Sequence, residues 1–471
     1  MRKGGKAYFA ANLVSQASAL ARYVILARLL GEHELGLAAM LILTAQFFES
    51  VSDTGSDRFI VQDADGDTTT MQGVVQMALA ARGVLIAVAL ALTAGLLAAL
   101  YGQPGLQAPL IAIGLAPLIG GFIHLDLRRA QRTQDFRPES LVILVSETLS
   151  LVATSVAAYI TRDHTAVIYG LVLRSLAQVA VSHVTAKRPY RWAYGEREAR
   201  RFSLFALPLF LNGLLLFVSG QGDRLVVGAG LGAATLGQYS AVVLLAYYPS
   251  TMLARFMAAI HLPQVAASRQ SGETLEAARW RLGSQITVLS VGIVVGFAVV
   301  APAFVPLLYG ASFAQSLQVI ALMGVLQALR FIRFWPTTIA LGAGRSLIVM
   351  LDNMARMVGL PLAIVAHLQF RTLEGVIGGF IVGEVVALIL ALTLLWRDGR
   401  VMLRAELRRV GLFLAACGST VAGAWMLQDG KLMEAGVCAA AVLVIAVAIY
   451  VAERATFEAT WTMVMKRLKR A

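Results

Sequence analysis

The sequence predicts an all-α polytopic membrane protein with about fourteen transmembrane helices. Of the 471 residues, 58% are hydrophobic and only 14% are charged, and the mean hydropathy is +0.73. A soluble chain has about 25% charged residues, so soluble and disordered classes are excluded. The apolar residues form runs of about 20, the length of a membrane-spanning helix. These runs lack the alternation of barrel strands, which favours helices.

Glycine, proline and clusters of charge separate the apolar runs, which we take in chain order. They lie at about 7–30, 35–58, 74–100, 106–126, 139–160, 165–186, 202–229, 235–262, 284–308, 315–341, 346–367, 374–396, 408–427 and 433–452. The first run follows a basic N-terminus, as a secretory signal does, but it continues past Arg22 to Leu30. Because that length can span the bilayer, we expect no cleavage.

The distribution of positive charge predicts the orientation of these helices. With the N-terminus placed in the cytoplasm, 28 of the 40 Lys and Arg fall in cytoplasmic connections and tails, nine fall within spans, and three fall outside. Lysine and arginine accumulate on the cytoplasmic side of membrane proteins. Both termini are therefore expected in the cytoplasm.

The net charge of +13 would suggest nucleic acid in a soluble protein, but here its location explains it. The basic clusters at 128–137, 187–201 and 397–409 are topology determinants that also meet anionic headgroups, so no nucleic-acid partner is expected. Cys417 and Cys438 lie in apolar runs and indicate neither a metal cluster nor a disulfide framework. No cofactor or metal motif is present in the sequence.

A repeat divides the chain into two parallel halves. Leu30–Gly36 matches Leu231–Gly237 at an offset of 201 residues, and both segments form the first outer turn of a set of six helices. Two parallel bundles favour an alternating-access transporter with a cavity between its lobes. The expected parts are an N-terminal lobe at 1–186, a basic cytoplasmic linker at 187–201, a C-terminal lobe at 202–396, a helix pair at 397–452 and a basic amphipathic cytoplasmic tail at 453–471.

Proline residues interrupt several spans of the second lobe. They are Pro208, Pro249, Pro302, Pro306 and Pro336, and each is either a hinge or a static kink.

Charged side chains within spans indicate a wet path or ion pairs, because a lone charge in lipid costs about 2.5–3.5 kcal/mol. The nine in-span arginines are Arg22, Arg28, Arg82, Arg174, Arg224, Arg255, Arg330, Arg333 and Arg356. They outnumber the embedded carboxylates, so a cationic surplus and an anionic substrate are expected. Snorkelling of Arg28, Arg82 and Arg255 to the interface is the competing interpretation.

The embedded carboxylates have two interpretations. Glu147, Asp223, Asp352 and Glu384 are either coupling sites for a proton or sodium ion or hydrogen-bonded acids between helices. Asp352 can also pair with Arg356 one helical turn away.

Four charged residues are expected at the inner end of the second span. Glu49, Asp53, Asp57 and Arg58 are too polar for lipid contact, and we place them at the cytoplasmic mouth of the cavity. At the opposite end, the predicted outer connections at 31–34, 101–105, 230–234 and 428–432 are only a few residues long. They offer little room for catalytic groups, so we expect a protein that is not an enzyme.

Short motifs in the first two spans resemble a known family. They are Ala27-Arg28-Leu29-Leu30-Gly31, Glu34-Leu35-Gly36-Leu37, Val51-Ser52-Asp53-Thr54-Gly55 and Phe59-Ile60-Val61-Gln62. They resemble the polysaccharide transporters, the Wzx-type repeat-unit flippases of the multidrug/oligosaccharidyl-lipid/polysaccharide (MOP) exporter superfamily. Members of that branch have fourteen spans, and the resemblance extends to the whole chain through this plan.

The resemblance implies a flippase of the bacterial inner membrane. Its substrate would be an undecaprenyl-pyrophosphate-linked oligosaccharide repeat unit for O-antigen, capsule or exopolysaccharide, and its partners membrane lipids and the polymerase and export machinery. The path would be lined by Arg22, Arg28, Arg224, Arg255, Arg330 and Arg333, since arginine suits phosphate. The prenyl tail would stay in lipid between the lobes, with spans 13 and 14 forming a groove for it.

Three alternatives remain. A lipid II flippase would share the fold and the cationic cavity. A drug or cation antiporter of the same superfamily would usually have twelve spans and an acidic, arginine-poor cavity. A membrane-embedded glycan enzyme would need catalytic carboxylates that converge in the fold.

Overall fold

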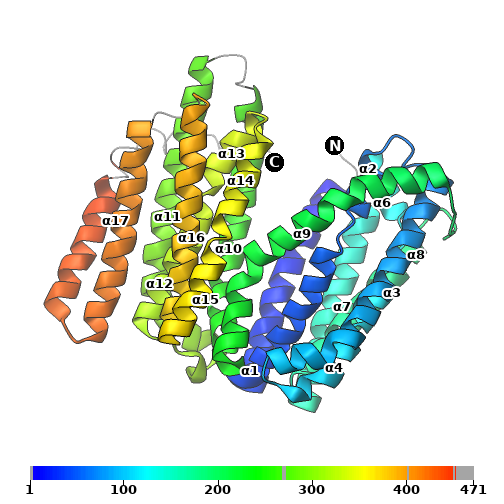
Figure 1. Cartoon of the computed structure of the whole chain (residues 1–471), viewed down its shortest axis with the longest axis horizontal. Helices are drawn as coiled ribbons and strands as arrows, with labels where there is room; N and C mark the ends of the chain where they lie inside the picture. The colour runs from blue at the N-terminus through cyan, green and yellow to red at the C-terminus, as the bar shows by residue number, and fades with distance from the viewer. Residues whose placement is uncertain (1–3, 268–271, 400–402, 449–450, 452–471) are drawn as a thin grey trace. The chain divides into compact units, whose positions relative to one another are not determined.

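The computed structural model describes residues 4–267, 272–399, 403–448 and 451, and this part of the chain is helical and contains no strand. The chain folds into two compact units, a first unit at 1–241 and a second unit at 242–471. The α-helices up to residue 231 are α1 Gly5–Val51, α2 Ser56–Gln62, α3 Thr69–Leu100, α4 Gln107–Ile113, α5 Leu115–Gly120, α6 Asp126–Arg132, α7 Arg137–Thr161, α8 Ala166–Thr185 and α9 Glu196–Leu231 (Figure 1).

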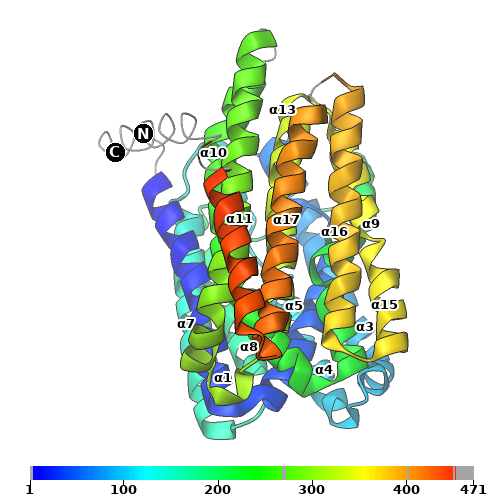
Figure 2. The same cartoon turned by 90° about the vertical axis from the view of Figure 1, so that its left-hand side faces the viewer.

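The helix α10 begins in the first unit and ends in the second. The remaining helices are α10 Ala233–Ala267, α11 Gly272–Tyr309, α12 Leu317–Ile332, α13 Phe334–Gly342, α14 Ser346–Arg356, α15 Gly359–Phe370, α16 Leu373–Arg397, α17 Leu403–Gln428 and a further apolar helix, Leu432–Ala448 (Figure 2). Short 3-10 turns precede α4 and α12, at Pro104–Leu106 and Ala311–Phe313.

The predicted fold class is confirmed. Within the described residues, 11 helical stretches are long and apolar enough to cross a membrane, and two shorter apolar helices span Pro104–Gly120 and Leu432–Ala448. One of the 11 stretches, Gly5–Gln62, bends at Gly31 and contains the first two predicted spans, so each of the fourteen predicted runs has a helical counterpart. The predicted tail at 453–471 lies outside the described residues.

The predicted boundaries of the lobes stay a prediction. Segment 187–201, expected to be a linker, has neither helix nor strand up to Gly195 and then enters α9, which packs against α1 and α3.

Close helix packing holds the first unit together. Helices α7 and α8 pack against each other, and α1 packs against α7. A Cβ atom on Gly170 of α8 would lie 1.8 Å from the Thr154 hydroxyl of α7, so only glycine permits this approach. The tight packing fixes the register in which polar side chains of α7 and α8 meet.

The span expected at 106–126 is shorter than predicted. It consists of a 3-10 turn, α4 and α5, and the helical part ends at Gly120. Residues 121–125 instead form a turn in which the His124 amide donates to the Ser182 hydroxyl at 3.0 Å. Apolarity alone does not distinguish such a turn from one more turn of helix.

The predicted proline interruptions differ in effect. Helices α9 and α11 continue through Pro208, Pro302 and Pro306. In contrast, the span at 315–341 breaks at Arg333, between α12 and α13, three residues before Pro336. A helical proline lacks the amide that the carbonyl four residues earlier needs, which weakens the helix at this point.

The core of the second unit surrounds this break. Trp335 is 1% exposed and belongs to an apolar cluster with residues of α11, α12, α16 and α17, among them Leu282, Leu329, Leu392 and Phe413. Side chains from several helices therefore pack around the junction between α12 and α13.

Candidate functional site

A charged cluster lies inside the first unit, where α1, α7 and α8 meet. Arg22 of α1 forms an ion pair with Glu147 of α7 at 3.0 Å and donates to the Ser150 hydroxyl at 2.5 Å. Arg174 of α8 approaches the other oxygen of Glu147 at 2.6 Å. The Ser150 hydroxyl also donates to the Gly170 carbonyl at 2.9 Å, which anchors the cluster to the α7–α8 contact.

The exposure of these side chains suggests which of them can contact a ligand. Glu147 is 3% exposed, whereas the side chains of Arg22 and Arg174 are 18% and 39% exposed. Within the described part of the chain, the Arg174 Nε atom is buried and has no hydrogen-bond partner. The sequence identifies Arg174 only as an in-span cation, and its shared contact with Glu147 makes it a member of this cluster.

A second charged cluster lies in the second unit. Arg333 contacts Asp352 through Nε at 3.1 Å, makes a further short hydrogen bond to the same carboxylate through Nη2, and approaches Glu384 through Nη1 at 2.5 Å. Arg356 and Arg330 approach the other oxygen of Glu384 at 2.8 and 3.4 Å. Asp352 is fully buried and Glu384 is nearly so.

The helix breaks of the second unit coincide with this cluster. Arg333 stands between α12 and α13, and Arg356 is the last residue of α14, before α15 begins at Gly359. At both points the backbone keeps right-handed helical dihedral angles, and the amides of Arg333, Met357 and Val358 still bond to carbonyls three or four residues earlier. Each break is therefore a short distortion within a continuous apolar stretch, and the three arginines surround the two acids beside these distortions.

Among the residues that the structure describes, each cluster holds one more arginine than carboxylate. The first has two arginines for Glu147, and the second has three for Asp352 and Glu384. A buried cation surplus favours a bound anion, and the guanidinium fork matches the oxygens of a phosphate. Asp352, for which helical spacing suggested Arg356 as a partner, makes a bidentate contact with Arg333 from another helix.

The coupling role of the four embedded carboxylates stays a prediction. Glu147, Asp352 and Glu384 are each paired with arginine, and Asp223 accepts a hydrogen bond from the Tyr239 hydroxyl at 2.8 Å. Among the residues that the structure describes, no three His, Cys, Asp or Glu side chains come together in a metal-binding arrangement.

The remaining predicted path residues differ in burial. Arg224 is buried beside Asp223 on α9. Arg28 and Arg255 are exposed, which agrees with either lining or snorkelling.

The predicted mouth residues lie at the C-terminal end of α1, in the turn that follows it, and in α2. Arg82 donates to the Glu49 carbonyl at 2.7 Å and to the Ser52 hydroxyl at 3.0 Å, beside a cavity of about 180 Å³ lined by both charged side chains. Asp53 accepts from the Gly55 amide and lies 3.9 Å from Arg58. Asp57 pairs with Arg128 at 2.7 Å, and Arg128 also pairs with Glu139.

An acidic loop at 63–67 neutralises several basic residues that we interpreted as topology determinants. Arg201 pairs with Asp63 at 2.7 Å and with Asp65. Asp67 lies 3.5 Å from Arg188 and 3.9 Å from Arg129. Arg129, Arg188 and Arg201 of the basic clusters therefore form ion pairs with this loop. The other basic residues of the clusters are the ones left to contact lipid headgroups.

His124 lies in the turn that follows α5, outside the apolar helix. Its Nδ1 accepts from the Asp126 amide at 3.0 Å, so its Nε2 proton faces the Arg188 carbonyl, also at 3.0 Å. Burial lowers the pKa of His124 from 6.5, and the neighbouring His183 and Arg129 lower it further, against the opposing effects of Asp126 and the Arg188 carbonyl. Protonation of Nδ1 would break the bond to Asp126.

We expect His124 to make the stability of the first unit depend on pH. Because the folded-state pKa lies below the unfolded value, stabilisation is complete above about pH 6.5 and is lost as the pH falls toward the folded-state value. Melting temperatures in detergent between about pH 7 and pH 5 should fall for the wild type and for His33→Gln, an exposed control. His124→Gln should melt lower at neutral pH with a flatter profile; an unchanged slope would contradict this role.

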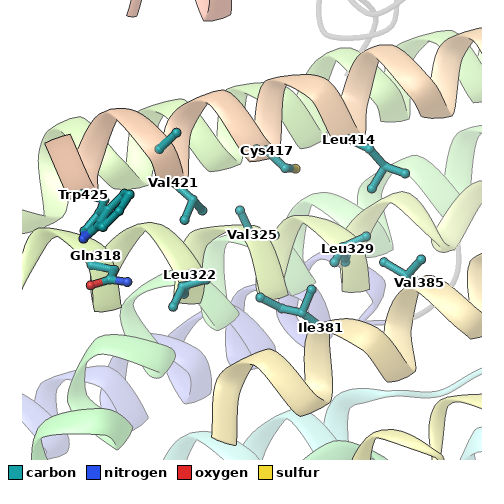
Figure 3. Close-up of a pocket in the computed structure, with 12 residues that line it drawn as sticks. Gln318, Leu322, Val325, Leu329, Ile381, Val385, Leu414, Cys417, Val421 and Trp425 are labelled. Atoms are coloured by element: carbon teal, nitrogen blue, oxygen red, sulfur yellow. The ribbon is translucent and has the colours of Figure 1, made fainter. Parts of the chain in front are cut away.

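An apolar groove runs along the second unit between α12, α16 and α17 (Figure 3). Leu322, Val325 and Ile381 face Val421 and Cys417 across it, and Trp425 and Gln318 lie at one end. Its volume is about 410 Å³. A second apolar pocket of about 450 Å³ lies between α11 and the helix Leu432–Ala448. Both can hold hydrocarbon.

Comparisons of sequence give the family. A family model described as "Polysaccharide biosynthesis protein" matches residues 25–318. The succinoglycan biosynthesis transport protein ExoT of Rhizobium meliloti (strain 1021) is 22% identical over 303 residues, 64% of this chain and 61% of that relative, so the match spans about three fifths of its length. The lipopolysaccharide biosynthesis protein WzxC of Escherichia coli (strain K12) is 22% identical over 399 residues, 82% of this chain and 79% of that relative.

Comparisons of structure give the fold. The lipid II flippase MurJ, in an inward closed conformation, matches with a TM-score of 0.66 at 11% identity and covers 94% of this chain and 98% of its own. A multidrug resistance MATE family transporter of the MOP superfamily, in an inward-facing conformation, matches with a TM-score of 0.62 at 17% identity, over 84% of this chain and 96% of its own. At these identities the likeness extends to the fold alone.

Proposed function

The chain belongs to the polysaccharide biosynthesis protein family, and from this premise we propose that it is a flippase for lipid-linked oligosaccharides. Its substrate would be an undecaprenyl-pyrophosphate-linked repeat unit, carried from the cytoplasmic to the periplasmic leaflet of the bacterial inner membrane. The names of the relatives ExoT and WzxC, a succinoglycan transport protein and a lipopolysaccharide biosynthesis protein, support this class of substrate.

The arginine surplus is the observation that carries the proposal. A pyrophosphate cannot cross hydrocarbon without cations, and each unit has a cluster in which arginines outnumber acids. The buried acids hold the guanidinium groups in place, and guanidinium groups suit the oxygens of a phosphate. The clusters thus bind and orient the headgroup without catalysis.

The apolar groove supplies a place for the prenyl chain. Its wall is formed by aliphatic side chains of α12, α16 and α17, with Trp425 at one end (Figure 3). The groove offers apolar contacts like those of the bilayer, so the lipid tail can stay beside the chain while the sugar moves. The clusters and the groove match the two chemical parts of the proposed substrate.

Deletion in the native host tests this function. We expect complete lipid-linked repeat units to accumulate on the cytoplasmic leaflet and surface polysaccharide to fall, with recovery on complementation by the wild type. Arg22→Ala and Arg330→Ala should complement poorly at normal protein levels, whereas Arg197→Ala, an exposed residue of the first turn of α9, should complement fully. Leaflet position is read by access of a membrane-impermeant lectin to intact spheroplasts.

Three results would overturn the proposal. Surface polysaccharide that is unchanged after deletion would remove the flippase role in this pathway. Intermediates that stop before the repeat unit is complete would indicate a glycan enzyme. If lipid II accumulates instead, the substrate is the peptidoglycan precursor.

A further inference from the structure

The two copies of the Leu-Gly repeat meet in the first unit. Gly31 ends the first half of α1 with φ 79° and ψ −178°, and Gly232 stands between α9 and α10 with φ 88° and ψ 176°. Only glycine adopts this region of backbone conformation readily. The repeat in sequence is therefore also a repeat of the same unusual turn.

The two turns cross by a reciprocal backbone contact. A Cβ atom on Gly36 would lie 1.8 Å from the Ala233 carbonyl oxygen, and one on Gly237 would lie 2.0 Å from the Glu32 carbonyl oxygen. Glu32 and Ala233, like Gly36 and Gly237, are 201 residues apart. The contact therefore has a local two-fold symmetry: the glycine of each repeat meets the carbonyl at the equivalent position of the other repeat.

The crossing has a dry centre and a polar rim. Leu35 and its repeat counterpart Leu236 are 1% and 0% exposed. At the rim, the Gln238 side-chain amide donates to the Glu32 carboxylate at 2.6 Å. Around Gly31 and Gly232, an added Cβ would meet no atom within 4 Å, so both bends face open space on that side.

We propose that this crossing is the closed form of an outer gate, formed by glycine-to-carbonyl contacts between the two repeats. The inference rests on the proposed function, and on the predicted orientation that places both turns outside, because a large polar headgroup has to leave at that end. The two bends at Gly31 and Gly232 give each hairpin a joint about which it swings. Glycine at 36 and 237 lets the gate close tightly enough to exclude water.

Reversible cross-linking tests the gate. Glu32→Cys and Gln238→Cys are combined in a protein that also carries Cys417→Ala and Cys438→Ala, purified and reconstituted in vesicles. A short bifunctional methanethiosulfonate then links the two repeats, and mass spectrometry of the linked peptides verifies the product. We expect translocation of a lipid-linked oligosaccharide to fall to the level of empty vesicles when linked, and to return on reduction.

The matched control links two residues that both lie in the predicted N-terminal lobe at 1–186. The Glu34 carboxylate contacts His164 at 2.8 Å, and Glu34→Cys with His164→Cys receives the same reagent. This link should leave translocation at the level of its own reduced form. Full activity of the linked Glu32–Gln238 pair would overturn the gate while the flippase stands. Absence of translocation in the wild type and in every reduced form would instead overturn the proposed function.

A glycine substitution gives a second test that does not need transport. In a variant with Leu35→Cys, Gly237→Ala should raise the labelling rate by a membrane-impermeant thiol reagent about tenfold, because the crossing can no longer close. Gly220→Ala is the control, since its added Cβ would meet no atom within 4 Å. Equal labelling rates in the two alanine variants would contradict a gate closed by these contacts.

Discussion

Arg333→Ala is expected to lower the free energy of unfolding by about 3–5 kcal/mol and to abolish transport. The substitution removes the bidentate partner of fully buried Asp352 and one of three arginines around Glu384. An uncompensated buried carboxylate is costly because it has left water without gaining a counter-charge. Thermal or denaturant unfolding in detergent, together with the amount of folded protein in the membrane, measures the loss.

A double variant separates the buried charge from the arginine itself. Arg333→Met with Asp352→Leu removes both members of the pair and leaves Glu384 with Arg330 and Arg356. Apolar replacement of a whole buried pair is often neutral, so the stability should largely return. Equal instability of the single and double variants would show that Arg333 acts through its packing.

Arg174→Gln combined with Arg330→Gln is expected to lose transport while the protein stays folded. Each change leaves its cluster with as many arginines as acids, so Glu147 keeps Arg22, and Glu384 and Asp352 keep Arg333 and Arg356. A hydrogen bond to a charged ligand contributes roughly 1.5–3 kcal/mol, so losing one at each cluster lowers transport about 100-fold or more.

The controls for this variant distinguish charge from shape. Arg174→Lys with Arg330→Lys keeps both charges without the planar fork and should keep part of the activity. Melting temperatures should match the wild type within a few degrees. Full transport by the double glutamine variant would contradict the role of the surplus arginines.

Much of the fold could be predicted because membrane helices are determined by local apolarity. The fourteen runs have helical counterparts, and the turn at Gly31 follows from a single glycine. Apolarity does not predict where a helix ends or is interrupted within an apolar run. The early end at Gly120 and the break at Arg333 depend on packing and on a proline.

Partners of the embedded charges were harder to predict because most of them lie far apart in sequence. Arg22 and Glu147 are 125 residues apart, and Arg333 and Glu384 are 51 apart. For Asp352, helical spacing suggested Arg356, yet the bidentate partner is Arg333 from another helix. The arginine partners of the acidic loop at 63–67 were equally hard to predict, because counting charges along the chain does not show which of them pair in the fold.

The reciprocal contact at the Leu-Gly turns illustrates the opposite case. The repeat was visible in the sequence as a topological marker, but the reason for its glycines was not. Gly36 and Gly237 are required because each approaches a carbonyl of the other repeat, a contact across 201 residues.

Translocation by the purified chain tests the central claim most directly. Vesicles containing the wild type receive two fluorescent lipids that carry the same short oligosaccharide and prenyl chain, one linked through pyrophosphate and one through a neutral ether. Loss of fluorescence to a membrane-impermeant quencher reports arrival at the opposite leaflet. The arginine clusters predict rapid movement of the pyrophosphate lipid, little movement of the neutral one, and loss of the difference in Arg174→Gln with Arg330→Gln. Equal movement of both lipids by the wild type would contradict this role of the clusters.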